Sequence, residues 1–320
     1  MGKDVSGHGR DTTGGGAGDG TDEARNGHEP LSRPSPSPSN AMLSSVHYPD
    51  DQLNVLVIGA HFDDCEIKFG GTAVKYAEQG HDVRFHVLTN GEAGHHEIGG
   101  LELTRTRRTE ARASAELAGV DLTYFENHEG ELRPTIENRN EVIRLIREFE
   151  ADLVFTHRPN DYHPDHRYTS ELVQDAAYMV TVPAIVRDTE HLMYNPVICY
   201  LSDDFQKPYR LEGDVVVDID DVVETKMEML HQHTSQMYEW LPYNYGTLEE
   251  VPQDEEARFE WLEETWLPEF ADLADRFRDE LIAAYGEERG AAVEYAEAFE
   301  ICEYGGTVTE ENYEALFPVV

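Results

Sequence analysis

The feature that most limits the possible folds is a regular alternation of short apolar runs and amphipathic segments between residues 53 and 233. Short runs rich in β-branched residues are typical of strands that are buried on both faces of a sheet. The predicted strands are LNVLVIGAH (53–61), DVRFHVLTN (82–90), LTYFEN (122–127), DLVFTH (152–157), PVICYL (196–201) and DVVVDI (214–219).

Predicted helices separate these strands. They cover residues 71–79, 103–118, 138–150, 165–180 and 222–233, and a glycine ends each of the first two. Strand and helix alternate in this way for about 170 residues. Because a strand–helix–strand unit places its strands parallel with a right-handed connection, the pattern predicts an α/β fold with a Rossmann-like, mostly parallel sheet and helices on both faces.

The segments on either side have different compositions. Residues 1–45 are rich in Gly, Ser, Pro and Asp with few apolar side chains, so they cannot offset the entropy of ordering and are predicted to form a disordered tail. The predicted catalytic domain covers residues 46–248. Residues 249–320 combine acids and aromatics at helical spacing, and no linker precedes them. We expect them to form an acidic helical extension packed on the catalytic domain.

The charge of the chain excludes several classes of partner. It contains 25 Lys and Arg against 65 Asp and Glu, a formal net charge of −40. Nucleic acid and anionic membrane surfaces are therefore not expected as partners. Such acidity indicates a salt-adapted, halophilic source. The three widely spaced cysteines, with no membrane-spanning apolar run, predict a cytoplasmic protein without a membrane span.

Two clusters of histidines and acids follow predicted strands. VIGAHFDDCE (57–66) places one histidine and three acids at the end of the first strand, and HRPNDYHPDHR (157–167) follows the fourth. Ligands of open parallel sheets bind outside the carboxyl ends of the strands, near the point where strand order reverses. We therefore expect one edge of the sheet to gather His61, Asp63, Asp64, Asp161, His163, Asp165 and His166.

The second cluster has a readable local geometry. Pro164 suits the first position of a helix, which makes His163 its N-terminal cap and puts His166 in its first turn. Two imidazoles with carboxylates are ligands suited to Zn²⁺, and three protein ligands with an open fourth position are typical of catalytic zinc. Each cluster alone fits a solvated acidic loop about as well, but both at one sheet edge favour a site.

Other site chemistries fit the sequence less well. A Ser-His-Asp hydrolase is not expected because the chain has no GxSxG sequence. Gly70 and Gly71 do not have the spacing of a nucleotide loop and are expected to allow close backbone packing.

The two clusters resemble the motifs of a known family. AHFDDCEIKFGGT (60–72) is similar to the AHPDDxE stretch, and DYHPDHR (161–167) to the HPDH stretch, of the PIG-L/LmbE-like deacetylases. The resemblance covers about residues 53–240. It implies a zinc-dependent hydrolase that removes acetyl from an N-acetylglucosamine-type amino sugar or its glycoconjugate, and it is compatible with a homo-oligomer. Phe62 stands where the family usually has proline.

The resemblance also implies roles for individual residues. His61, Asp64 and His166 would be the ligands of zinc or another divalent metal, and Asp63 the general base. His163 would support the transition state, and Asp165 or Asp161 would hold it in its charged form, although a helix N-terminus opposes that charge. Two alternatives stay open: a metal-dependent hydrolase of another amide or ester, and a catalytically silent carbohydrate-binding protein of the same fold.

Several further residues have two interpretations each. His95 and His96 could touch substrate or be solvated. Arg105, Arg107 and Arg108 could bind a phosphate or pair along a helix. The aromatic run SQMYEWLPYNYG (235–246) could face a sugar ring or pack in the core. Glu66 is expected to hold a ligand or the loop, and Cys65 to be a buried small residue.

Overall fold

A seven-stranded sheet runs through the computed structural model, which describes residue 49 and residues 52–320. The disordered tail predicted for residues 1–45 lies outside the described residues. The strands are β1 (Asn54–Gly59), β2 (Asp82–Thr89), β3 (Asp121–Asn127), β4 (Leu153–Thr156), β5 (Val197–Leu201), β6 (Val215–Asp218) and β7 (Ala296–Ile301).

The order of the strands confirms the predicted architecture. It is β3-β2-β1-β4-β5-β7-β6, and the first five strands of this order are parallel. Only β7 runs the other way, antiparallel to both β5 and β6. The chain moves outward from β1 to β3 and then returns to place β4 on the other side of β1, so strand order reverses between β1 and β4.

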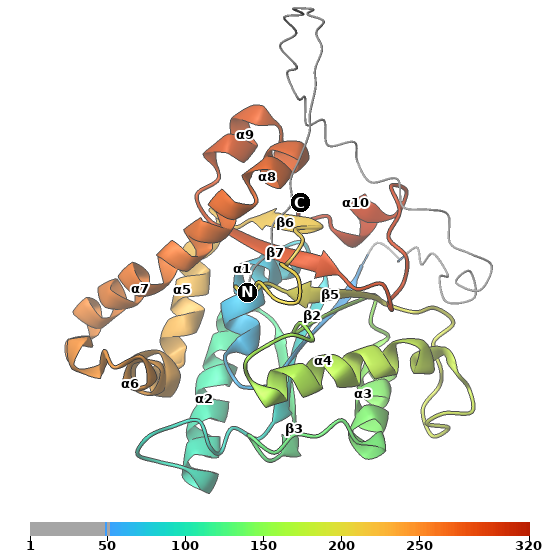
Figure 1. The fold of residues 1–320 in the computed structure, drawn as a ribbon, viewed down its shortest axis with the longest axis horizontal. Coiled ribbons are helices and arrows are strands. Elements are labelled where there is room, and N and C mark those ends of the chain that lie inside the picture. Colours follow the sequence, from blue (N-terminus) through green and yellow to red (C-terminus); the bar gives the residue numbers. More distant parts are fainter. Residues whose placement is uncertain (1–48, 50–51) are drawn as a thin grey trace, which may run out of the picture. The chain divides into compact units, whose positions relative to one another are not determined.

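Helices cover both faces of this sheet, as the alternation predicts (Figure 1). The longer elements are α1 (Asp64–Glu78), α2 (Gly100–Ala118), α3 (Ile136–Phe149), α4 (Pro164–Ala177), α5 (Val223–Gln232), α7 (Glu255–Arg276) and α8 (Arg278–Tyr285). The short elements are η1 (Tyr178–Thr181), the π-helix η2 (Ser235–Trp240), α6 (Leu241–Tyr245), η3 (Leu248–Glu250), α9 (Glu287–Ala292) and α10 (Tyr313–Leu316). α3 and α4 pack together on one face, whereas α5 contacts α1 and α2 on the other.

Alternate side chains of β1 enter two separate cores. Val55 and Val57 pack in the core that includes Phe69 of α1, whereas Leu56 and Ile58 pack in the core beneath α3 and α4. All four β1 side chains have no exposed surface. Full burial on both faces explains why the β1 sequence is a continuous apolar run rather than an alternating one.

Helix α1 begins at Asp64, seven residues before the predicted start at Gly71. Gly70 and Gly71 lie inside the helix, where a Cβ on Gly71 would lie 2.8 Å from Ile219 Cγ2. The glycines therefore serve close packing, as expected, and do not mark a helix boundary. Asp64 and Glu66 lie in the first turn, where their negative charges suit the helix N-terminus.

The acidic extension predicted for residues 249–320 contains the helices α7, α8, α9 and α10, and it also contains a strand that was not predicted, β7. This strand inserts between β5 and β6, and its Glu297 is buried against Lys226 with 2.6 Å between Oε1 and Nζ. The two glutamates in AEAFEI hid the strand signal, because charged residues are rarely buried without a partner elsewhere in the chain. The C-terminal segment thus completes the sheet, while the domain boundary at residue 248 stays a prediction.

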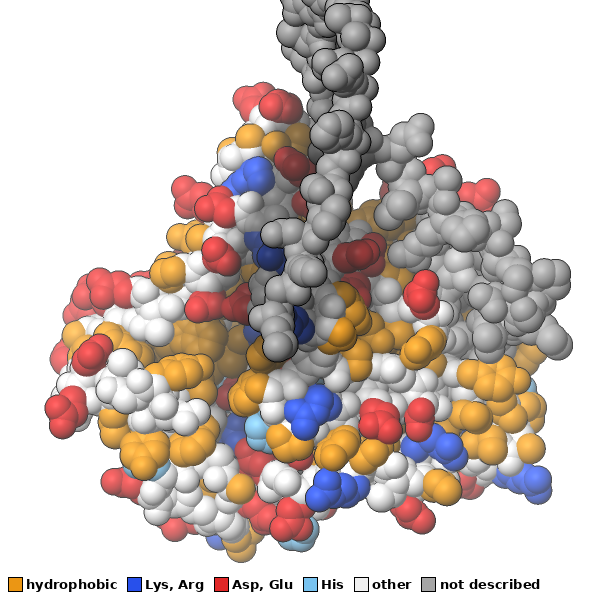
Figure 2. Space-filling view, viewed as in Figure 1, with side chains coloured by type: hydrophobic (Ala, Val, Ile, Leu, Met, Phe, Trp, Pro, Cys, Tyr) orange, Lys and Arg blue, Asp and Glu red, His pale blue; other side chains and the backbone are white. Residues whose placement is uncertain are grey.

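The described surface is strongly acidic, and the visible face in Figure 2 carries scattered Asp and Glu side chains with few Lys and Arg. Within residues 52–320, no helix combines the length and apolar character that crossing a bilayer requires.

Candidate metal centre and active site

The two predicted clusters meet at the carboxyl ends of β1 and β4. Because strand order reverses between these neighbours, their following loops turn to opposite faces and leave a crevice between them. The loop after β1 brings His61, Asp63 and Asp64, and the loop after β4 brings the segment from His157 to His166. The structure therefore joins two parts of the chain that lie about a hundred residues apart.

Donor atoms of three residues, His61, Asp64 and His166, form the centre of this crevice. His61 Nδ1 lies 3.1 Å from His166 Nε2, and Asp64 lies 3.6 Å from the former through Oδ2 and 3.5 Å from the latter through Oδ1. Bonds of ~2.0–2.2 Å to a tetrahedral metal would set ligand atoms about 3.3–3.6 Å apart. These separations of 3.1–3.6 Å are close to that spacing, and His61, Asp64 and His166 stay the predicted ligands.

The outward-facing atoms of these three residues are all held in place. His61 Nε2 lies 3.3 Å from Asp165 Oδ2, and His166 Nδ1 lies 3.0 Å from Asp161 Oδ1. Asp64 Oδ2 accepts hydrogen bonds from the backbone N–H groups of Ala60 and His61, at 2.9 and 2.8 Å. Carboxylates on the second nitrogen of a histidine fix its ring orientation, which is the arrangement that supports metal-binding imidazoles.

His157 is part of the site, although sequence reasoning gave it no role. Its Nε2 lies 3.1 Å from Asp64 Oδ2, and its ring stacks on that of His166 with centroids 4.1 Å apart and an interplanar angle of 7°. Its position, as the first residue after a buried strand at the same sheet edge, was the available signal. His157 therefore contacts both Asp64 and His166 and holds the two side chains relative to each other.

A second grouping of imidazoles shares these atoms. One nitrogen each of His61, His163 and His166 lie within 4.8 Å of one another, as do donor atoms of Asp64, His157 and His166. His157 already uses Nε2 on Asp64, and His163 uses Nδ1 to cap a helix. The set of His61, Asp64 and His166 remains the one in which each residue keeps a donor atom for the metal and has its other polar atom held.

His163 caps α4, as predicted, but its expected charge is not supported by its surroundings. Its Nδ1 accepts a hydrogen bond from the backbone N–H of Asp165 at 3.2 Å, so this nitrogen carries no proton. Burial, together with the His61 and His166 rings, lowers the pKa of His163 to about 4. The ring is neutral, and Nε2–H is its remaining donor.

The Asp165 and Asp161 carboxylates contact the two other histidines of the cluster, so a role in holding the His163 ring stays a prediction. The Asp165 carboxylate faces His61 and also accepts the Gly130 N–H at 2.6 Å. The Asp161 carboxylate faces His166 and accepts the backbone N–H of His163 at 2.8 Å. Each acid therefore orients a candidate metal ligand, Asp165 from the first turn of α4 and Asp161 from the loop that precedes this helix.

Asp63 is placed differently from its neighbour. Its backbone has φ 139° and ψ −24°, a conformation that residues with a Cβ rarely adopt, and its side chain does not cap α1. Instead Oδ1 lies 3.2 Å from Arg107 Nη2. Burial raises the pKa of Asp63 to about 6, with Arg107 opposing and Asp64 reinforcing that rise. A carboxylate of this pKa is suited to accept a proton near neutral pH.

Arg107 is buried and links three parts of the site. Its guanidinium donates to the Phe62 carbonyl at 2.7 Å and to Glu129 Oε1 at 2.9 Å, besides Asp63. Arg107 thus pairs with carboxylates of other segments inside the protein, rather than along its own helix as predicted. Arg108 pairs with Glu126 at the surface instead.

The electric field of the site favours a cation. Burial lowers the pKa of His61, but the Asp165 hydrogen bond and the Asp64 and Glu129 carboxylates outweigh it and raise that pKa to about 9. The carboxylates around His61 therefore favour a positive charge at this place. This agrees with the donor set, which contains nitrogen and oxygen but no sulfur.

Residues around the motifs fix the first loop. Phe62, at the usual proline position, is fully buried, and a Cβ on Gly91 would lie 2.8 Å from its ring. The packing of the Phe62 ring thus restrains this loop where a proline would restrain its backbone. Cys65 is buried in a hydrophobic core, as expected, and its thiol lies 3.7 Å from the Val57 carbonyl oxygen. Glu66 pairs with buried His233 at 3.1 Å and holds the loop rather than a ligand.

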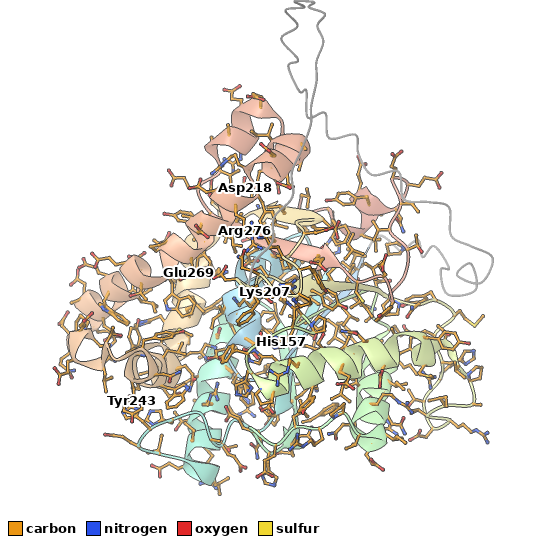
Figure 3. All side chains as sticks on the ribbon, in the orientation of Figure 1. His157, Lys207, Asp218, Tyr243, Glu269 and Arg276 are labelled. Carbon is orange, nitrogen blue, oxygen red and sulfur yellow. The ribbon has the colours of Figure 1, made fainter. Side chains whose placement is uncertain are left out.

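A cavity of about 610 Å³ opens over the cluster. The catalytic loops form its floor, and residues of η2, α6 and α7 form its opposite side. Arg276 at the end of α7 donates from Nη1 to the carbonyl of Asp203, a residue that lines the cavity, at 3.0 Å. Figure 3 marks Arg276 and Glu269 on α7 and His157 at the end of β4.

The aromatic run 235–246 is divided between the two roles considered for it. Trp240 and Tyr245 line the cavity. Tyr238 is buried in a core cluster, and its hydroxyl lies 2.6 Å from His231 Nδ1. Tyr243 stacks on His96 with centroids 4.1 Å apart.

His95 and His96 lie outside the metal cluster. His95 Nε2 lies 2.8 Å from Glu239 Oε2, and His96 lies between the rings of His95 and Tyr243. The two histidines thus fasten the loop after β2 to η2 and α6.

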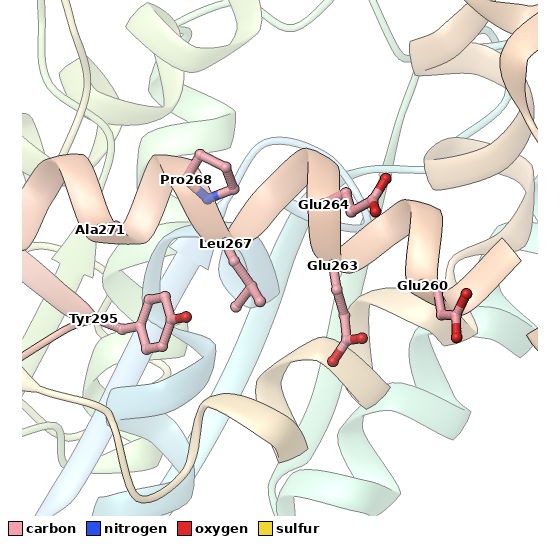
Figure 4. Close-up of a pocket in the computed structure, with 7 residues that line it drawn as sticks. All are labelled: Glu260, Glu263, Glu264, Leu267, Pro268, Ala271 and Tyr295. Carbon is pink, nitrogen blue, oxygen red and sulfur yellow. The ribbon is translucent and has the colours of Figure 1, made fainter. Parts of the chain in front are cut away.

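Another open groove, of about 460 Å³, lies on α7 (Figure 4). Its lining consists of Glu260, Glu263, Glu264, Leu267, Pro268, Ala271 and Tyr295. Pro268 interrupts the helix hydrogen bonds there. Because this lining offers neither imidazole nor cation, the crevice over β1 and β4 is the candidate active site.

Comparisons with known proteins agree with this location. The model of the PIG-L family, described as GlcNAc-PI de-N-acetylase, matches residues 56–177, which contain both clusters. The diacetylchitobiose deacetylase of Thermococcus kodakarensis is 31% identical over 220 residues, which cover 64% of this chain and 81% of that protein. The solved N,N'-diacetylchitobiose deacetylase from Pyrococcus horikoshii has a TM-score of 0.60 and 26% identity, with 78% of this chain and 84% of that chain covered.

A relative with a different reaction also matches. The 4-oxalmesaconate hydratase of Pseudomonas putida is 23% identical over 206 residues, which cover 62% of this chain and 80% of that protein. This likeness is one of fold, and it leaves the reaction to be argued from the residues of the site.

Proposed function

Because this chain belongs to the PIG-L family, we propose that it is a metal-dependent hydrolase that removes the acetyl group from an N-acetyl amino sugar of the N-acetylglucosamine type, or from its glycoconjugate. The observation that carries the proposal is the triangle of His61, Asp64 and His166 donor atoms, with Asp63 beside it in the same cavity. The diacetylchitobiose deacetylases among its relatives make a short N-acetylated saccharide the first substrate to try.

His61, Asp64 and His166 would hold the metal, with zinc the first candidate and other divalent ions as options. A bound divalent ion would polarise the amide carbonyl and make water more acidic at this place. Asp165, Asp161 and His157 would keep the three ligands in orientation through the contacts described above.

The chain's own residues would then move the protons. Asp63 would take a proton from the attacking water as the new C–O bond forms, and Arg107 would keep its carboxylate in place. His163 would donate Nε2–H to the oxygen on which negative charge develops. The C–N bond then breaks, and the proton on Asp63 passes to the leaving nitrogen. The products are acetate and the free amine.

Hydration of an unsaturated acid is the competing reaction suggested by the hydratase relative. Its substrate, 4-oxalmesaconate, is by name a carboxylate. The cavity of this chain is lined by Asp63, Asp64, Glu129, Asp161, Asp203, Asp204 and Glu269. Arg107 and Arg158 line it too, but both are engaged by carboxylates. A cavity with this balance repels a carboxylate substrate, which favours the neutral amide.

Acetate release tests the proposal. The purified protein, loaded with Zn²⁺ in concentrated salt, should release acetate from N,N'-diacetylchitobiose, and metal analysis should give about one divalent ion per chain. A metal-free protein, or a loaded one that releases no acetate from any N-acetyl sugar, would refute the enzyme proposal. The second result would favour the alternative of a catalytically silent carbohydrate-binding protein.

A cytoplasmic location, a salt-adapted source and a homo-oligomeric state remain predictions. An N-acetyl amino sugar is the small-molecule partner that we propose, and the charge of −40 argues against nucleic acid.

A further inference from the structure

Strand β3 forms an uncovered edge of the sheet. It comes first in the strand order, and within residues 52–320 its only strand partner is β2. None of its seven residues is buried. The strand at the opposite edge, β6, is buried along its whole length and packs against α8 (Figure 1). An uncovered edge presents unpaired backbone N–H and C=O groups to any chain that can extend the sheet.

The direction of the backbone groups at this edge follows from a comparison with β1. Leu53, just before β1, packs on the side of the sheet that carries α1, and its carbonyl accepts the Asp82 N–H of β2 at 2.9 Å. The next carbonyl, that of Asn54, points the other way and accepts the Asp152 N–H at 2.9 Å. Because β3 is parallel to β1, residues of β3 whose side chains lie on the α1 side point their N–H and C=O groups away from β2.

Three residues of β3 meet this condition. Leu122 and Tyr124 pack against the small core cluster beneath α2, which lies on the α1 side, and Glu126 pairs with an arginine of α2 at 2.6 Å. The carbonyl of the next residue, Asn127, agrees with this alternation, since it faces β2 and accepts the Asn90 N–H at 2.8 Å. The N–H and C=O groups of Leu122, Tyr124 and Glu126 therefore face outward.

A row of arginines on α2 lies beside this edge. Arg105, Arg108 and Arg112 are three and four residues apart, which places them on one face of the helix. The Arg108 guanidinium lies over the Tyr124 ring, 4.1 Å from its centroid, and Arg112 Nη2 donates to the Tyr124 hydroxyl at 3.1 Å. The face of α2 with the three arginines therefore overlies β3.

The edge is locally basic although the chain has a net charge of −40. Within residues 52–320, Arg105 and Arg112 form no ion pair, and neither do Glu102 and Glu116, the two exposed acids of α2. A second copy of this chain would bring the same arginines to the edge across a two-fold axis, so like charges would oppose its pairing. A strand that carries carboxylates on the side facing α2 would be attracted instead.

We infer that the edge of β3 is a docking site for an extended acidic segment of another protein, which joins the sheet beside β3. Its backbone pairs with the outward groups of Leu122, Tyr124 and Glu126, and carboxylates on alternate residues reach Arg105 and Arg112. Seven helical residues separate these arginines by about 10 Å, a distance that about three strand residues span. The segment therefore carries acids two or four residues apart with β-forming residues between them. The site is independent of the proposed deacetylase function.

Binding of synthetic peptides tests this site. The probes are three fluorescein-labelled peptides of eight residues: one with alternating Glu and Val, one with alternating Lys and Val, and a Glu-Val peptide with a central proline. Fluorescence anisotropy is measured in the lowest salt concentration that keeps the protein folded. We expect the Glu-Val peptide to bind at least about ten-fold more tightly than the other two, because only it can both pair as a strand and attract the arginines.

Two substitutions at one position separate strand pairing from charge. Glu126→Gln releases Arg108 and keeps the outward N–H, so affinity for the Glu-Val peptide should rise by about two- to five-fold. Glu126→Pro also releases Arg108, but it removes an N–H that makes no bond to β2, so affinity should fall by at least about five-fold. The Glu126 side chain is 70% exposed, and both variants should keep a Tm close to that of the wild type.

Arginine substitutions test the charge directly. Arg105→Gln combined with Arg112→Gln should weaken binding of the Glu-Val peptide by about ten-fold, whereas Arg187→Gln, at an exposed arginine outside α2, should leave it unchanged. If Glu126→Pro binds as tightly as Glu126→Gln, or the Lys-Val peptide binds as tightly as the Glu-Val peptide, the inference is wrong. A dimer in sedimentation that Glu126→Pro dissociates would assign the edge to a second copy and would also overturn it.

Discussion

The inner and outer sides of the cavity are built in opposite ways. On the inner side, His61, Asp64 and His166 are each less than 10% exposed and held by neighbouring side chains or backbone. The outer side, which we call the outer wall, consists of lining residues of η2, α6 and α7. On the outer wall, Tyr245 is exposed, and Asn244 and Glu269 have no side-chain partner within the described residues. Groups that perform chemistry must be held in one geometry, whereas groups that recognise a ligand must exchange water for it.

The two sides also differ in their origin along the chain. The inner side comes from two short loops at the ends of adjacent parallel strands, where position is fixed by the sheet. The outer wall comes from helices that lie beyond the sheet and depend on buried anchors such as Lys226, whose ammonium lies 3.6 Å from the centre of the Phe270 ring of α7. Substitutions on the two sides should therefore have different effects on activity, metal binding and stability.

The largest effect should follow removal of the metal. Dialysis against a chelator should lower acetate release by more than about 10³-fold, because the inner side has no other strong electrophile. Returning one equivalent of Zn²⁺ should restore activity and raise the Tm. If the protein keeps full activity when metal analysis finds no bound metal, the distinction between the two sides is wrong.

Asp63→Asn should have the next largest effect. Loss of a general base costs about 10²–10⁴-fold in kcat, and we expect the metal content to stay at the wild-type level because Asp63 is not among the proposed ligands. Measuring both kcat and metal content distinguishes the loss of a base from the loss of the metal. His61→Ala is the matched comparison, since it should lose the metal itself.

Lys226→Met tests the anchor of the outer wall. Lys226 and Glu297 are fully or almost fully buried, and removing one partner of such a pair destabilises a protein by about 3–5 kcal/mol. Chemical denaturation would measure the loss. The double variant Lys226→Met with Glu297→Gln should recover part of it, because Gln still accepts from a backbone N–H at Gly71 or Thr72. No recovery would mean that the ion pair is not the anchor.

Asp165→Asn should weaken the inner side without removing a ligand. Changing the partner of a metal-binding histidine lowers metal affinity by about 10–100-fold. Competition with a chelator would measure that affinity, and kcat at saturating metal should change much less. A large loss of kcat with unchanged metal affinity would instead assign Asp165 to the chemistry, as the sequence first suggested.

Glu269→Gln should have the smallest effect. The amide keeps one acceptor for a sugar hydroxyl, so loss of the charge should raise KM for N,N'-diacetylchitobiose by about two- to ten-fold. The same change should raise kcat/KM for an anionic disaccharide relative to kcat/KM for the neutral one. Steady-state kinetics with both substrates would show whether charge on the outer wall selects the ligand.

Much of the inner side could be predicted from the sequence, because the strands and helix ends that build it follow from residues that are neighbours along the chain. The run 53–61 had to be a doubly buried strand, Pro164 had to start a helix, and the ends of parallel strands had to meet. The contacts of Asp165 and Asp161 could not be read in this way, since their partners are set by side-chain directions in the folded crevice. His157 was missed because its position after β4 indicates the edge of the sheet but not which neighbours its ring contacts.

The sequence by itself determined the fold class, the edge of the sheet that carries the site and the residues that gather there, because strand burial, helix capping and parallel connection depend on neighbours along the chain. Only the tertiary structure decided that β7 completes the sheet and that the outer wall faces the metal cluster. Those results depend on pairs such as Lys226 and Glu297, 71 residues apart, whose burial is favourable only when both are present.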